Sequence, residues 1–107
     1  MTSARGANEA RGEAAFRVGD ATLVLRPSFE ALVAAEEELG PLFALCDRAS
    51  EGRVSIGELA ILFDHLSRHA RPTAVDREAI GNALVTGGLA AAMPILRTIL
   101  VQILQGR

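Results

Sequence analysis

Several residue types that carry function in other proteins are scarce in this chain of 107 residues. Tryptophan and tyrosine are absent, phenylalanine occurs four times, and all eleven basic residues are arginine. Proteins that bind single-stranded nucleic acid use aromatic platforms beside positive grooves, and duplex binders use a basic face. The arginines here are intermixed with acids and the formal net charge is −2, so we expect no nucleic-acid partner.

The chain also has a single cysteine and no long uninterrupted apolar run. Cys46 alone can form neither a disulfide framework nor a cysteine-based zinc site, and its place in the apolar run at residues 42–46 predicts a buried, unreactive thiol. Residues 1–12 lack the apolar middle of a signal peptide. The apolar C-terminal stretch is interrupted by polar residues and Pro94, which makes it too short and too polar to span a bilayer. We therefore expect a bacterial cytoplasmic protein, free or on a virion, with no membrane partner.

The composition predicts a short tail followed by one domain. Residues 1–12 are small or charged and show no periodicity, which is typical of a disordered tail. Half of the chain is hydrophobic, mostly Leu, Ile, Val and Ala, which favours a helix-rich core. Residues 13–107 are thus predicted to form a single, mainly helical α+β domain, in which an N-terminal β-hairpin packs on four to five helices.

The hairpin is predicted from two alternating segments, residues 13–18 and 21–26. They flank Gly19-Asp20, a two-residue loop whose leading glycine suits a primed turn. The resulting register gives one apolar face, which must lie against the helices because a lone hairpin is marginal in water. The predicted cross-strand pairs are Val18 with Ala21, Phe16 with Leu23, Ala14 with Leu25, and Glu13 with Arg26.

Capping and turn residues predict the helices that follow. A Ser or Asp side chain satisfies the first free N–H groups of a helix, and Gly favours its end. The predicted helices are residues 29–39 between Ser28 and Gly40, a second from Pro41 to about residue 49, a third from a Ser55–Glu58 capping box to about residue 70, a fourth capped by Thr73 with Asp76, and residues 89–107 after Gly87-Gly88, which Pro94 should kink or restart.

The last of these helices is apolar on most sides, so it must be buried by its own domain or by a partner. Burial within the domain is limited in a chain of this size, because small domains bury proportionally less surface. We therefore predict protein–protein association through this helix. The predicted partner-binding residues are Leu89, Met93, Leu96, Ile99, Leu100, Ile103 and Leu104 along one stripe, with Ile95 and Val101 on its flank.

Residues 47–58 have the length of an EF-hand calcium loop, with Asp47, Gly52 and Glu58 at its first, sixth and twelfth positions. Calcium needs several oxygen ligands at once, but the third position carries alanine and two arginines add positive charge. Because Gly52 can end one helix and Glu58 can help to cap the next, we favour a helix–turn–helix. A degenerate calcium-binding module built on Asp47, Glu51 and Glu58 is the alternative.

His65 and His69 are four residues apart, as in metal-binding pairs. They are expected on the solvated side of their helix, opposite the Leu59–Phe63–Leu66 stripe, and no third ligand is evident. We interpret them as surface histidines near a helix C-terminus, where their positive charge interacts favourably with the helix dipole. We expect no metal or cofactor.

Glu36 falls within the apolar face predicted for residues 29–39. A partly buried carboxylate needs a partner, and Arg17 or Arg26 of the hairpin should provide it as a structural ion pair. A catalytic acid is the alternative, but no nucleophile or second carboxylate is placed to work with it, so we expect no enzyme. The side chains expected on that face are Phe29, Leu32, Val33 and Leu39, with Glu37 and Glu38 on a solvated edge.

The order of these turns and caps resembles a family of small proteins encoded in the tail modules of gene transfer agents and related prophages. The resemblance covers residues 12–106 and implies no catalytic residues. The motifs that carry it are Leu25-Arg26-Pro27-Ser28-Phe29-Glu30-Ala31-Leu32, then Glu36 and Gly40, the turn from Gly52 to Ser55, the helix start Asp76-Arg77, and Gly87-Gly88-Leu89 before an apolar helix.

Members of this family are described as tail tube or tail-assembly-chaperone proteins. A tube subunit needs many strands, whereas only two strands are predicted from this sequence. A chaperone that shields the tape-measure protein needs an exposed apolar helix or groove, so the predicted strands and helices favour that role, with tape-measure or other tail proteins as partners. The alternatives are a tube or other virion component, and a homo-oligomer in which the C-terminal helices bury one another.

Overall fold

A β-hairpin opens the part of the chain that this computed structural model describes, residues 12–106. Strands β1 (Ala14–Val18) and β2 (Ala21–Leu25) pair antiparallel in the predicted register, with Phe16 opposite Leu23. Gly19 has a φ of 60°, the left-handed backbone that a leading glycine allows in a primed turn. Glu13 and Arg26 form the predicted cross-strand ion pair, with 2.7 Å between Oε2 and Nε. The prediction of the hairpin and its register is confirmed.

The helices that follow are α1 (Phe29–Leu39), α2 (Leu42–Ser50), α3 (Ile56–Ser67) with a 3₁₀ turn η2 (Arg68–Ala70), α4 (Arg77–Gly87) and α5 (Leu89–Gln105). The caps lie largely where the sequence predicted them. Ser28 accepts a hydrogen bond from the third residue of α1, and Ser55 with Glu58 forms the reciprocal capping box of α3. Asp76 alone is the N-cap of α4, where its side chain accepts from the main chain of Ala79.

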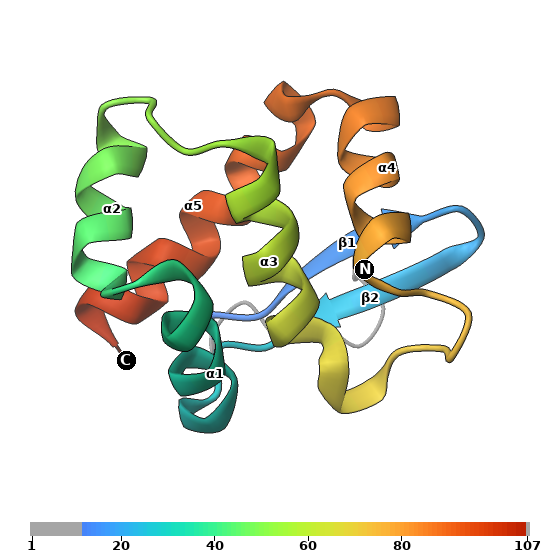
Figure 1. Cartoon of the computed structure of the whole chain (residues 1–107), viewed down its shortest axis with the longest axis horizontal. Coiled ribbons are helices and arrows are strands. Elements are labelled where there is room, and N and C mark those ends of the chain that lie inside the picture. The colour runs from blue at the N-terminus through green and yellow to red at the C-terminus, as the bar shows by residue number, and fades with distance from the viewer. Residues whose placement is uncertain (1–11, 107) are drawn as a thin grey trace, which may run out of the picture.

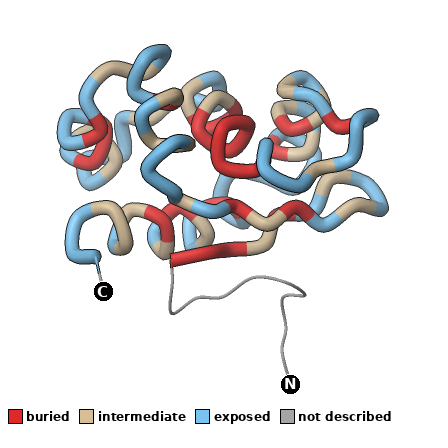
Figure 2. Tube along the Cα trace, turned by 90° about the horizontal axis from the view of Figure 1, so that it is seen from below, coloured by how far each residue is buried: buried red, intermediate tan, exposed pale blue. Residues whose placement is uncertain are grey.

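The central element is α3, which lies between α1, α4 and the hairpin (Figure 1). Its residues Leu59, Leu62, Phe63 and Leu66 are almost completely buried. The rings of Phe16 and Phe63 meet edge to face, 5.1 Å apart, and join the hairpin to α3. Figure 2 shows buried positions on the first strand and inside the helices, with exposed positions on the outer turns. The predicted mainly helical α+β fold is confirmed.

The outer edge of β2 is closed by the end of α3 and by η2. The main-chain N–H of Arg26 donates to the carbonyl oxygen of Leu66 at 2.8 Å, and Nε2 of His69 lies 2.8 Å from the carbonyl oxygen of Val24. In the observed register the main-chain groups of Val24 and Arg26 point away from β1. These contacts therefore satisfy groups that an open strand edge would present to solvent.

The C-terminal helix α5 continues through Pro94 without restarting, and it packs across β1. Gly12 is buried against it, since a Cβ at Gly12 would lie 2.2 Å from Cγ of Gln102. Residue 12 thus belongs to the fold, and the other eleven residues of the predicted disordered tail lie outside the described residues.

Within residues 12–106, no helix taken alone has both the length and the hydropathy to cross a membrane. Helices α4 and α5 have this length and hydropathy only when they are taken together, and their axes are bent by 118° relative to each other.

Candidate protein-binding surface

The fold divides the nine predicted partner-binding residues between the core and the surface. Leu96 and Ile99 face inward and are 5% and 0% exposed, so they belong to the core of this chain and are left out of the candidate surface. Partner binding by the others stays a prediction. Those partly buried against the core are Ile95, Leu100 and Ile103, and those with substantial exposure are Leu89, Met93, Val101 and Leu104.

Helix α1 presents a different face to the core from the one predicted. Ala35 is fully buried, and Leu32 and Leu39 pack partly against the core. Phe29 and Val33 instead point outward and are 84% and 40% exposed, so the prediction that they face the core is wrong. A small side chain at the contact lets α1 lie close to α3, and this rotates the larger apolar side chains into solvent.

A second aromatic side chain, which the sequence did not single out, is also exposed. Phe43 in the first turn of α2 is 78% exposed. It borders an apolar hollow of about 160 Å³ where α1, α2 and α5 meet. The hollow is lined by Glu36, Leu42, Phe43, Ile103 and Leu104.

The exposed apolar side chains on α1, on α2 and on the C-terminal half of α5, the three helices that meet at this hollow, are called the apolar strip; they are Phe29, Val33, Phe43, Val101 and Leu104. Phe29 and Val33 are neighbours on α1, and the same helix face continues to Glu36 at the hollow. Leu104 lines the hollow from α5, and Val101 is its neighbour on the exposed side of that helix. Large exposed apolar patches are uncommon on monomers and often mark interaction sites.

Glu36 makes no ion pair with the hairpin, so that prediction is wrong. Its Oε2 accepts a hydrogen bond from the main-chain N–H of Leu42 at 3.0 Å and thereby caps α2. Arg26 is engaged by Glu13, and Arg17 donates to a carbonyl of its own turn. Glu36 therefore fixes α2 beside α1, which positions Phe43 at the hollow.

A buried ion-pair network holds α4 and η2 against α3. Asp64 is 1% exposed and accepts hydrogen bonds from Arg68 Nη2 at 2.7 Å, from Arg77 Nε at 2.9 Å and from Arg71 Nη1. Burial alone would raise the pKa of Asp64, but the hydrogen bonds from the three arginines outweigh it and hold that pKa well below its usual range. Asp64 is therefore ionised at neutral pH and structural in role.

Glu38 extends this network to α1. Its carboxylate accepts from Arg77 Nη1 at 2.8 Å and lies 2.5 Å from Nε2 of His65. The hydrogen bond from Arg77, followed by that of His65, lowers the pKa of Glu38 from 4.5 to about 2. Glu38 is exposed, as predicted, although its carboxylate is paired. The prediction that His65 faces solvent is wrong, because His65 is only 7% exposed.

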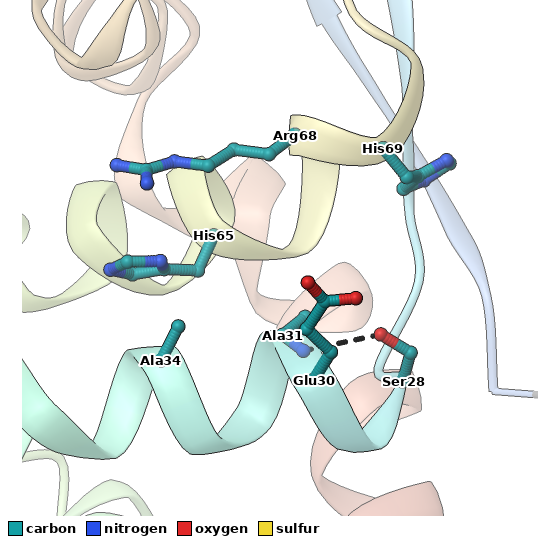
Figure 3. Close-up of a pocket in the computed structure, with 7 residues that line it drawn as sticks. All are labelled: Ser28, Glu30, Ala31, Ala34, His65, Arg68 and His69. Atoms are coloured by element: carbon teal, nitrogen blue, oxygen red, sulfur yellow. Dashed lines mark hydrogen bonds between the residues drawn. The ribbon is translucent and has the colours of Figure 1, made fainter.

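A hollow of about 270 Å³ lies between α1 and the end of α3 (Figure 3). Its polar side chains are mostly committed to the fold: His65 to Glu38, Arg68 to Asp64, and His69 to the edge of β2. Within residues 12–106, no three His, Cys, Asp or Glu side chains are grouped so as to hold a metal ion. This hollow therefore presents no arranged set of free catalytic or ligating groups in the described part of the chain.

The segment at residues 47–58 forms the predicted turn between α2 and α3. Gly52 has a φ of 73°, and the Glu58 carboxylate accepts from the main-chain N–H of Ser55 at 3.0 Å and from Arg48 at 2.8 Å. The Ser55 hydrogen bond, together with Arg48, lowers the pKa of Glu58. Glu51 is likewise paired, with Arg53. Two of the three carboxylates proposed as calcium ligands thus already have arginine partners.

Cys46 is buried in α2, as predicted, and burial raises the pKa of its thiol. A neutral, buried thiol is a poor nucleophile and packs as a small apolar side chain.

Comparison with known proteins identifies one family. The family described as "Phage tail tube protein, GTA-gp10" matches residues 11–106, which is most of the chain. No curated protein and no solved structure matches the chain. The match agrees with the resemblance seen in the caps and turns of the sequence. The chain thus belongs to the phage and gene-transfer-agent tail family described as GTA-gp10.

Proposed function

We propose that this protein is a non-enzymatic assembly chaperone for a phage-like tail, and that it binds the tape-measure protein while the tail is built. The observation that carries the proposal is the apolar strip, in which two phenylalanines are 84% and 78% exposed. Membership of a tail family suggests other tail proteins as the partners that cover it.

The strip suits an elongated helical partner. The hollow between α1, α2 and α5 can receive one apolar side chain, and the rows on α1 and α5 run away from it along their helices. In an amphipathic helix bound along these rows, the partner's apolar residues spaced three and four apart would contact successive side chains of the strip. Each large apolar side chain that becomes fully buried in the contact contributes about 1.5–3 kcal/mol to the free energy of binding, so a few such side chains suffice to hold the partner. Covering the partner's apolar face in this way would prevent its aggregation.

A test replaces strip residues by acids. Val101→Glu with Leu104→Glu leaves the core intact, since the two are 46% and 52% exposed, and should abolish co-purification of the co-expressed tape-measure protein. Val85→Glu on α4 is the matched control, because Val85 is 63% exposed and lies away from the strip. Ile95 is unsuitable for this purpose because it packs partly against the core.

Retention of the tape-measure protein by the double variant would refute the proposal. Circular dichroism should show unchanged helicity in both variants, which separates loss of binding from loss of folding. A double variant that unfolds while Val85→Glu does not would also contradict the proposal, since it would place the strip residues in the core.

The second candidate is a structural component of the tail tube. The family description, which names a tail tube protein, favours it. In that case the chain should be found in purified particles in many copies, whereas a chaperone should be absent from them. Quantitative mass spectrometry of purified particles separates the two functions.

A further inference from the structure

Carboxylates border the apolar strip on α1 and α2. Glu30 and Glu37 lie on the exposed side of α1, next to Phe29 and Val33 on the helical wheel. Glu30 also lines the hollow between α1 and the end of α3 (Figure 3). Asp47 stands one turn after Phe43 on the exposed side of α2. These three residues, Glu30, Glu37 and Asp47, are the acidic rim.

The acidic rim is unpaired in the described part of the chain. None of its carboxylates lies within 4.0 Å of an arginine or histidine nitrogen there, whereas Glu13, Glu38, Glu51, Glu58 and Asp64 all do. Glu36 adds a fourth carboxylate, inside the hollow itself. On the other side of the strip, Arg97 of α5 is the single cation between Met93 and Val101 on the exposed face.

We infer that the segment captured by the strip is a basic amphipathic helix, with an apolar face flanked by lysine or arginine side chains. This inference rests on the proposed function and adds the charge of the partner to it. Opposite charges around an apolar contact speed encounter and fix register, and like charges exclude wrong partners. A helix with acidic flanks would place its carboxylates against the acidic rim.

The same arrangement disfavours a second copy of this chain as the occupant. A two-fold contact pairs the strip with itself, so the three carboxylates of each rim face either the other rim or, with the axis along the strip, a side whose cation is Arg97. Arg97 could offset only part of this repulsion, since it is one cation on a face with several free carboxylates.

The test compares two synthetic amphipathic helices of about five turns. Both carry the same leucine face, and their flanking positions are lysine in one and glutamate in the other. Fluorescence anisotropy with the full chain should show the lysine peptide binding at least about tenfold tighter in low salt, and this advantage should shrink at about 0.3 M salt because of screening.

A rim variant then tests which residues are responsible. Glu30→Gln with Glu37→Gln and Asp47→Asn should weaken binding of the lysine peptide about tenfold and remove most of its salt dependence. The control is Asp20→Asn with Glu78→Gln, which neutralises two exposed acids on the hairpin turn and on α4, away from the strip. It should leave the affinity unchanged.

Equal affinity for the two peptides, no binding of the lysine peptide, or an unaffected rim variant would each overturn the inference. So would self-association through the strip, detected by light scattering as a dimer that Val101→Glu with Leu104→Glu dissociates. The proposed function has its own readout. If the tape-measure protein is lost by the Val101→Glu, Leu104→Glu variant but retained equally by the rim variant, the chaperone role stands and the charge inference fails.

Discussion

Replacing Asp64 by Asn is the sharpest test of how the fold is held together. The Asp64 carboxylate is 1% exposed and receives hydrogen bonds from Arg68, Arg71 and Arg77. Asparagine has nearly the same shape but keeps one acceptor oxygen and turns an NH₂ group toward guanidinium donors. The variant therefore removes the counter-ion of Arg68 and Arg71 at the end of α3, whereas Arg77 keeps its ion pair with Glu38.

The magnitude follows from how far each arginine can reach water. Removing one member of a buried ion pair costs about 3–5 kcal/mol. Arg68 and Arg77 side chains are 52% and 38% exposed and can be hydrated after the change, whereas Arg71 is only 17% exposed. We therefore expect a loss of about 3 kcal/mol in the free energy of unfolding, at the low end of that range. For a chain of this length the melting temperature should fall by about 10 °C.

Urea denaturation at pH 7, followed by circular dichroism, measures this loss. Asp20→Asn in the exposed hairpin turn is the matched control and should change stability by less than about 0.5 kcal/mol. A loss below about 1 kcal/mol for Asp64→Asn would refute the reasoning, since the buried charge would then have no structural role. Arg71→Met should also destabilise more than Arg68→Met, in the order of their burial.

Three further predictions concern acid, close packing and the core. The pKa of Glu38 falls from 4.5 to about 2 on folding, so its contribution to stability is present above pH 4.5 and is lost as the pH drops toward 2. The urea midpoint of the wild type should therefore fall as the pH is lowered across that window. A midpoint that does not change with pH would contradict this prediction. Gly12→Ala should lower the melting temperature, with a loss of about 1–3 kcal/mol, because its φ is +76° and a Cβ would collide with Gln102; an unchanged midpoint would mean that residue 12 does not pack there. Ile99→Ala should cost about 2–5 kcal/mol in urea denaturation, whereas Val101→Ala on the exposed face should stay within about 0.5 kcal/mol; equal losses would contradict the orientation of α5.

The elements that the sequence predicts well are those decided by local chemistry. The leading glycine of the hairpin turn, the Ser28 cap and the Ser55–Glu58 capping box each act within a few residues. Their effects do not depend on how distant parts of the chain pack, so the strand register and most helix ends could be predicted.

The faces of the helices could not be predicted in the same way, because they depend on distant contacts. On α1 both the Phe29–Val33 row and the row through Ala35 have helical spacing. Glu38 decides between them by bonding to Arg77 and to His65, which are 39 and 27 residues away in sequence. The same distant contact buries His65, which the sequence placed in solvent.

The candidate surface was predicted only in part, for a related reason. The apolar character of α5 predicted that some of it would remain outside the core, and Val101 and Leu104 do. Phe43 could not be identified, because its exposure depends on how Glu36 caps α2 beside α1. Aromatic residues in first helical turns, next to a proline or a cap, would have been the available signal.

The closed side of β2 limits how copies of this chain could polymerise through their strands. A circular head-to-tail assembly needs two complementary edges on every subunit, one to give and one to receive. Val24 and Arg26 are already bonded to His69 and Leu66, which leaves β1 as the only strand edge of the hairpin not engaged in this manner within residues 12–106. One free strand edge can pair two copies edge to edge, and no further copy can then be added through the strands. A ring of many subunits built by strand addition would first require η2 to move away from β2. In a ring that keeps η2 in place, helix surfaces would have to form the interfaces between subunits.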